Sequence, residues 1–231
     1  MRAFEVGRAY QRDPAAQADG FAVAGVRQPM RVAGIACGPA ADEQWGIASR
    51  AVDFFDVKGD VEALLAPLVA VFERADHPAL HPGRSARVLL DGRSIGWLGE
   101  LHPRWQEKYE LPRPAVLFEI DAAPLTATGL PQVGEPSRFP PVVRDLAVVV
   151  AAGQPAQALL DVLVAHKPGF VHEIRLFDLY HGKGVPEGRK SLAFRIVMQD
   201  TERTLTDVEA DLAITKMVEL LARRFAATLR T

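Results

Sequence analysis

The order of strands and helices predicted after residue 137 limits the possible folds more than any other feature of this sequence. Strands are predicted at residues 145–150, 171–180, 190–199 and 226–230. A helix is predicted at 154–166, and a second begins with Thr206 and Glu209, which have the spacing of a capping box. The order strand-helix-strand-strand-helix-strand predicts an α+β domain with a ferredoxin-like split β-α-β fold. In that fold both helices cover one face of the sheet, and the other face can stay open.

Alternation along the strands at 171–180 and 190–199 divides their side chains between the two faces. The apolar face is predicted to be buried as a core and to contain Phe177, Leu179, Leu192, Phe194, Ile196 and Met198. The other face is predicted to contain Asp178, Tyr180, Ser191 and Arg195. A carboxylate, a phenol, a hydroxyl and a guanidinium on a rigid sheet suit a flat polar ligand such as an exposed nucleobase.

The first part of the chain has a different pattern, in which short apolar runs are separated by turns. Asp91-Gly92 lies between two such runs and is a strong hairpin signal. A helix is predicted after Asp56, with apolar residues at helical spacing as far as Phe72. These features favour an antiparallel sheet with one packed helix. Closely spaced prolines and glycines then predict a linker at 126–136 between domains at 1–125 and 137–231.

Charge and composition exclude several functional classes. Residues 137–231 contain 13 basic and 11 acidic residues, a net charge of +2, which is too small to indicate nucleic-acid binding by charge alone. No apolar run approaches the roughly 20 residues that a membrane helix needs, and the N-terminus lacks a signal-peptide pattern. The single cysteine cannot form an internal disulfide, which agrees with a cytoplasmic location.

Six ordered motifs extend through the chain. They are FEVGR at 4–8, VDFFDVKGD at 52–60, HPGRSA at 81–86, GELHP at 99–103, SRFP at 137–140 with Arg144-Asp145, and ERTLTD at 202–207. Together they resemble the C-terminal part of the β subunits of bacterial phenylalanine-tRNA ligases, and the resemblance covers essentially all 231 residues.

The resemblance implies that residues 1–125 form part of a class II synthetase-like module without catalytic chemistry, followed by a ferredoxin-fold anticodon-binding domain. It implies a fragment that is inactive alone and contributes to ATP-dependent charging of tRNA within an α2β2 heterotetramer. The expected partners are the phenylalanine tRNA and the α subunit, and neither DNA nor a membrane is expected. ATP and Mg²⁺ are expected to bind elsewhere in the assembled enzyme, so neither catalytic residues nor metal ligands are expected in this chain.

The resemblance also points to Asp178, Tyr180 and Ser191 as anticodon contacts, the same residues that alternation places on one face. Tyr180 offers a ring on which an unstacked base can lie. An ionised Asp178 can accept hydrogen bonds from the N1-H and N2-H₂ groups of guanine. Arg195 could contact phosphate or pair with Asp178. Around the Gly-rich hairpin, Lys183, Arg189 and Lys190 are expected near the RNA backbone.

Taken without the resemblance, these residues have ordinary structural explanations. Tyr180 could be a cross-strand packing residue, and Asp178 with Arg195 could form a surface pair worth about 0–1 kcal/mol. The alternative function is a ferredoxin-like regulatory or dimerisation module that binds a small metabolite, which an exposed apolar sheet face would favour. His77 and His81 have a metal-like spacing, but the proline that follows each disfavours one helix presenting both rings to zinc.

Overall fold

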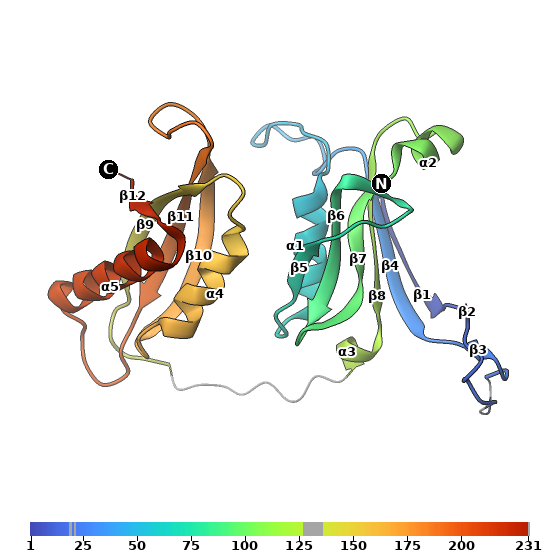
Figure 1. Ribbon diagram of the computed structural model, residues 1–231, viewed down its shortest axis with the longest axis horizontal. Coiled ribbons are helices and arrows are strands. Elements are labelled where there is room, and N and C mark those ends of the chain that lie inside the picture. Colours follow the sequence, from blue (N-terminus) through green and yellow to red (C-terminus); the bar gives the residue numbers. More distant parts are fainter. Residues whose placement is uncertain (19, 21, 127–135, 231) are drawn as a thin grey trace. The chain divides into compact units, whose positions relative to one another are not determined.

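The computed structural model describes residues 1–126 and 136–230, apart from residues 19 and 21 (Figure 1). The chain divides into two compact units, Met1–Leu130 and Pro131–Thr231, and each has its own hydrophobic core. Most of the predicted linker, residues 127–135, lies outside the described residues. None of the described helices is long and apolar enough to cross a membrane.

The first unit is built on an antiparallel sheet, as the sequence predicts, and this sheet has six strands. Its order is β1 (Arg2–Arg8), β4 (Met30–Cys37), β8 (Ala115–Asp121), β7 (Arg93–Leu101), β6 (Leu80–Leu90) and β5 (Val71–Arg74). Two short strands, β2 (Gln11–Arg12) and β3 (Val26–Arg27), pair separately. The predicted hairpin joins β6 to β7, and both Asp91 and Gly92 have positive φ, as a type I′ turn requires.

Helix α1 (Phe54–Leu65) packs on β7 and β8 and buries Val57, Val61 and Leu65. It is shorter than predicted, because Pro67 follows the C-cap residue Ala66 and disfavours helical backbone there. Phe72 therefore lies in β5. Two further helices, α2 (Pro103–Lys108) and α3 (Ala123–Thr126), are short.

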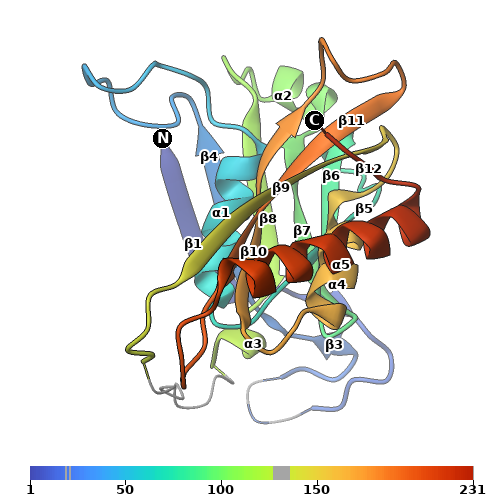
Figure 2. The same cartoon turned by 90° about the vertical axis from the view of Figure 1, so that its left-hand side faces the viewer.

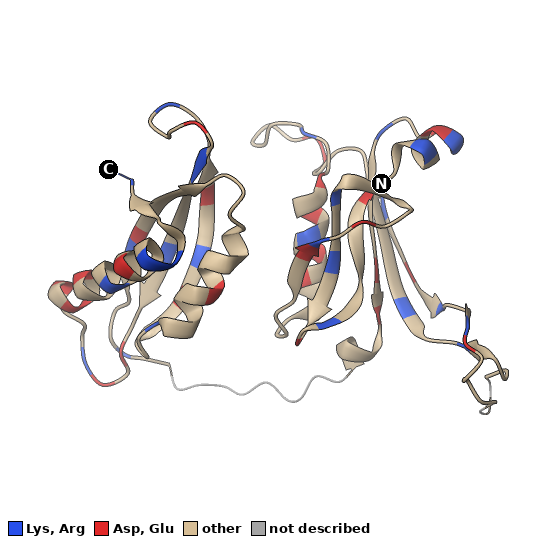
Figure 3. Cartoon of the chain, in the orientation of Figure 1, with Lys and Arg blue, Asp and Glu red and all other residues tan. Residues whose placement is uncertain are grey.

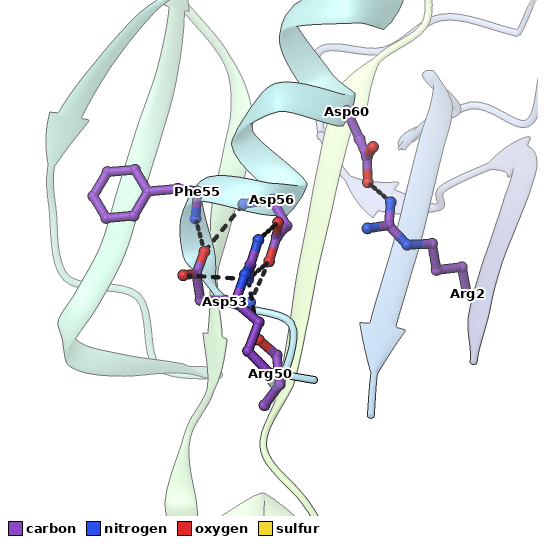
Figure 4. Close-up of polar contacts among 7 residues, drawn as sticks. Arg2, Arg50, Asp53, Phe55, Asp56 and Asp60 are labelled. Atoms are coloured by element: carbon purple, nitrogen blue, oxygen red, sulfur yellow. Dashed lines mark hydrogen bonds and ion pairs between the residues drawn. The ribbon is translucent and has the colours of Figure 1, made fainter. Parts of the chain in front are cut away.

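Acidic residues fix the beginning of α1 (Figure 4). The Asp53 carboxylate accepts hydrogen bonds from the backbone amides of Phe55 and Asp56, at 2.8 and 3.1 Å. The Asp56 carboxylate in turn accepts from the Asp53 amide at 2.8 Å and from both terminal nitrogens of Arg50 at 2.7 and 2.6 Å. The hydrogen bonds from Arg50 are the main reason that the pKa of Asp56 is lowered to about 2. The third aspartate of the VDFFDVKGD motif, Asp60, forms an ion pair with Arg2. Helix capping and ion pairs therefore account for all three aspartates of the motif.

Replacing Asp56 with alanine is expected to lower the free energy of unfolding of the first unit by about 1 kcal/mol at pH 7, the usual contribution of a helix cap. Because the folded pKa is about 2 and the unfolded one about 3.9, this stabilisation should be lost as the pH falls from about 4 towards 2. Urea titrations at several pH values measure the difference, with Asp42→Ala as an exposed control. An equal loss of unfolding free energy by Asp56→Ala at pH 7 and at pH 3 would contradict stabilisation of α1 by the ionised Asp56 carboxylate.

The second unit has the predicted element order. Its sheet has the order β10 (Val171–Tyr180), β11 (Arg189–Met198), β9 (Val142–Ala151) and β12 (Thr228–Leu229), and every neighbouring pair is antiparallel. Helices α4 (Ala156–His166) and α5 (Asp207–Phe225) contact each other, and both contribute to the core beneath the sheet (Figures 1 and 2). The capping box of Thr206 and Glu209 is confirmed at the start of α5. The ferredoxin-like arrangement is therefore confirmed, with one sheet face free of helices.

Candidate nucleic-acid interface

The two central strands of the second unit separate an apolar from a polar face. Leu146, Val148 and Val150 of β9 are buried on the helix-covered face, together with Leu192, Phe194, Ile196 and Met198 of β11. Directly opposite residues share a face, so Arg195 and its partner Asp145 lie on the other one. This helix-free side of the sheet is called the open face below.

A β-bulge in β10 changes what the open face contains. Leu176 pairs with Phe194, but the next paired residues are Asp178 and Ala193, which leaves Phe177 as an extra residue. The extra residue breaks the alternation, so Phe177 and Asp178 both lie on the open face. Phe177 is 46% exposed, and the guanidinium carbon of Arg195 lies 5.0 Å from its ring centroid. The prediction that Phe177 is a core residue is therefore wrong.

Leu179 keeps its predicted face but not its predicted burial. It lies opposite the buried Leu192, on the helix-covered face, and is 50% exposed. The edge position of β10 explains this exposure, because no further strand covers that side.

Arg195 is held by a neighbour that sequence analysis missed. Its Nε and Nη2 donate to the two carboxylate oxygens of Asp145 at 2.9 and 2.8 Å. This bidentate contact raises the pKa of Arg195 and lowers that of Asp145. The considered pairing of Arg195 with Asp178 is wrong, because Asp145 occupies the guanidinium. Among the described residues Asp178 has no ion-pair partner, and its side chain is exposed on the sheet edge.

Tyr180 is partly buried and held on several sides. Its hydroxyl donates to the Lys183 carbonyl at 3.3 Å, and the Arg230 guanidinium carbon lies 4.5 Å from its ring centroid. Gly182 lets the ring approach the hairpin, since a Cβ there would lie 2.8 Å from the phenol oxygen. The Arg230 amide donates to the Ala147 carbonyl at 2.9 Å, which fixes the backbone of this residue beside β9.

The contact between Tyr180 and Arg230 crosses the sheet. Tyr180 belongs to one edge strand and Arg230 follows the other, so their side chains meet above the two inner strands. Ser191 and Val149 are paired with each other on those inner strands and are 2% and 5% exposed. Ser191 thus lies on the expected face but is covered, whereas Asp178 is open.

The three predicted phosphate contacts occupy different positions. Lys183 lies in the hairpin, while Arg189 and Lys190 are the first residues of β11. Arg189 pairs with Ala151 and shares the face of Ser191, whereas Lys190 pairs with the buried Val150 and belongs to the opposite face. Figure 3 shows basic residues in the hairpin between β10 and β11 and at the start of β11.

The histidines considered for zinc have local backbone roles. Nδ1 of His77 accepts from the Ala79 amide at 3.3 Å, and Nδ1 of His81 accepts from the Gly83 amide at 2.9 Å. Within the described part of the chain, no group of three His, Cys, Asp or Glu side chains could hold a metal ion.

Comparison with known proteins agrees with both units. Residues 1–122 match the family model described as the phenylalanyl tRNA synthetase beta chain CLM domain, and residues 137–230 match the ferredoxin-fold anticodon binding domain. The phenylalanine–tRNA ligase beta subunits of Dechloromonas aromatica and Aromatoleum aromaticum are 53% and 51% identical over 230 residues, covering 100% of this chain and 28% of each relative. That of Ralstonia nicotianae is 51% identical over 239 residues, covering 30% of its length. The chain thus spans less than a third of these relatives, and it belongs to the phenylalanyl-tRNA synthetase β chain family.

Proposed function

We propose that the open face of the second unit binds the anticodon loop of the phenylalanine tRNA. The observation that carries this proposal is the unpaired Asp178 carboxylate beside the Tyr180 ring, on the helix-free face of a ferredoxin-fold anticodon-binding domain. The match to that domain favours RNA over the regulatory or dimerisation alternative. The face also carries the Arg195–Asp145 ion pair, so it is not the continuous apolar surface that the alternative requires.

Asp178 is the residue proposed to recognise the first anticodon base, guanine. An ionised carboxylate only accepts hydrogen bonds, and the N1-H and N2-H₂ edge of guanine offers two donors. Adenine does not present this pair of donors. Because Asp178 has no competing ion pair among the described residues, it can face a base without first breaking one.

Tyr180 and Ser191 require a small rearrangement to take part. The Arg230 guanidinium covers one side of the Tyr180 ring, so a base stacks either after Arg230 moves or on the outer face of the guanidinium. A base can contact Ser191 only when the Tyr180 ring and the Arg230 guanidinium separate, because Ser191 lies beneath their contact. Once Arg230 is displaced from the Tyr180 ring, we expect it to contact the phosphates of the RNA backbone, together with Lys183 and Arg189. Lys190 is less suited to a phosphate contact, because it belongs to the face opposite to Ser191. The charge of Arg195 is already neutralised by Asp145.

The first unit is proposed to contribute association with an α subunit within an α2β2 enzyme. Its edge strand β1 leaves Phe4 81% and Val6 54% exposed, beside a groove of about 430 Å³ lined mainly by apolar residues of β1, β4 and α1. Catalysis, ATP and Mg²⁺ belong to the assembled cytoplasmic ligase, at sites outside this chain. This chain alone is proposed to be inactive in phenylalanine-dependent ATP–pyrophosphate exchange.

Binding of the whole chain to an anticodon stem-loop tests the proposal. Changing the first anticodon base from guanine to adenine is expected to weaken binding, and Tyr180→Leu should weaken it by roughly 5- to 100-fold through loss of stacking. Binding should also weaken with salt. Tyr109→Leu, an exposed tyrosine of the first unit, is the matched control and should have no effect. Equal affinity for both loops, or an unchanged affinity of Tyr180→Leu, would refute base recognition by this face.

A further inference from the structure

We infer that Phe177 is a second stacking residue, which holds the nucleotide next to the base that Asp178 recognises. This inference rests on the proposed function and extends it to a residue that alternation assigns to the core. The bulge brings Phe177 and Asp178 together opposite Ala193, so an apolar ring and a free carboxylate stand side by side on the open face. Bulges commonly redirect a side chain in this way next to functional sites.

The surroundings of Phe177 hold the ring in place while leaving part of it uncovered. Arg195 lies 5.0 Å from the ring centroid and is itself fixed by two hydrogen bonds to Asp145. This packing covers one side of the ring, and 46% of the residue remains exposed. A half-exposed aromatic ring that is held by a guanidinium loses little conformational freedom when a base stacks on it, because its position is already restricted.

The spacing of the two rings suits two separate bases. Asp178 pairs with Ala193 and Tyr180 with Ser191, and Phe177 comes one residue before Asp178, so the two rings leave the strand roughly 7–10 Å apart. Bases stacked on each other in a helical strand are only about 3.4 Å apart. Phe177 and Tyr180 therefore fit neighbouring nucleotides that have been unstacked, which is how single-stranded RNA loops are usually recognised.

Phe177→Leu tests this role, because leucine keeps an apolar side chain but removes the ring. Binding of the whole chain to the guanine-containing stem-loop should weaken by roughly 5- to 100-fold, while Phe177→Tyr should bind like the parent chain. Leu179→Ala is the matched control, since Leu179 lies in the same strand with similar exposure but on the opposite face. It should leave the affinity unchanged, and thermal unfolding should show that all variants stay folded.

Stem-loops with an abasic nucleotide on either side of the first anticodon base identify the stacked partner. For one of the two positions, the abasic loop should bind the parent chain as weakly as the intact loop binds Phe177→Leu, and combining both changes should add no further loss. If the parent chain discriminates guanine but Phe177→Leu binds equally well, the role of Phe177 is refuted and the proposed function stands. If the parent chain does not discriminate, the proposed function itself fails.

Discussion

Phe194→Ala is expected to lower the free energy of unfolding of the second unit by about 3–5 kcal/mol, as for other fully buried phenylalanines. Phe194 is 0% exposed and lies at the centre of β11, between Leu176 of β10 and Leu146 of β9. Truncation leaves a cavity beneath the strand that supports Ser191 and Arg195. Anticodon binding should fall with the folded fraction of this unit.

The tryptophans make the effect on each unit measurable separately. All 3 tryptophans, Trp45, Trp97 and Trp105, belong to the first unit, so their fluorescence reports its unfolding. The far-ultraviolet circular dichroism signal contains contributions from helices α4 and α5, so it also reports unfolding of the second unit. Phe194→Ala should shift a transition seen by circular dichroism and leave the tryptophan transition in place. Phe177→Ala, at a phenylalanine on the open face of the same sheet, should cost much less, and equal costs for both would contradict the assigned faces.

Asp178→Asn is expected to weaken binding of the guanine-containing stem-loop by roughly 100-fold, because hydrogen bonds to a charged group contribute about 1.5–3 kcal/mol each. Asparagine keeps one acceptor, but its NH₂ group faces a second donor of the guanine edge. The stem-loop with adenine in the first anticodon position should bind the parent chain and Asp178→Asn with similar affinity. Because Asp178 is exposed and forms no ion pair among the described residues, the substitution should change the free energy of unfolding by less than about 0.5 kcal/mol.

Local sequence signals predict much of this structure because they act over a few residues. The Asp91-Gly92 turn and the Thr206 and Glu209 cap are such signals, and the structure contains both. The order of strands and helices then limits the second unit to a split β-α-β arrangement. Asp178 and Tyr180 share a face, as alternation predicts, because the bulge lies just before them and leaves the spacing between them intact.

The features that sequence analysis missed depend on pairing between distant segments. An extra residue at Phe177 is invisible until its strand is aligned with β11. The partner of Arg195 is Asp145, 50 residues away, and that contact follows from the register of β9 with β11. Arg230 covers Tyr180 only because β12 lies on the far edge of the sheet. The bulge and these two contacts decide which polar groups are accessible to a ligand, so the site could not be described from the sequence alone.

The most direct test of the account is a double-mutant cycle between Asp178 and the first anticodon base. Asp178→Asn is combined with replacement of guanine by inosine, which lacks only the N2-H₂ group, and all four affinities are measured with the whole chain. If Asp178 accepts a hydrogen bond from that group, the two losses overlap, with a coupling of about 1 kcal/mol or more. Losses that simply add would show that Asp178 does not accept a hydrogen bond from the N2-H₂ group, and the proposed recognition of guanine through both of its donors would be contradicted.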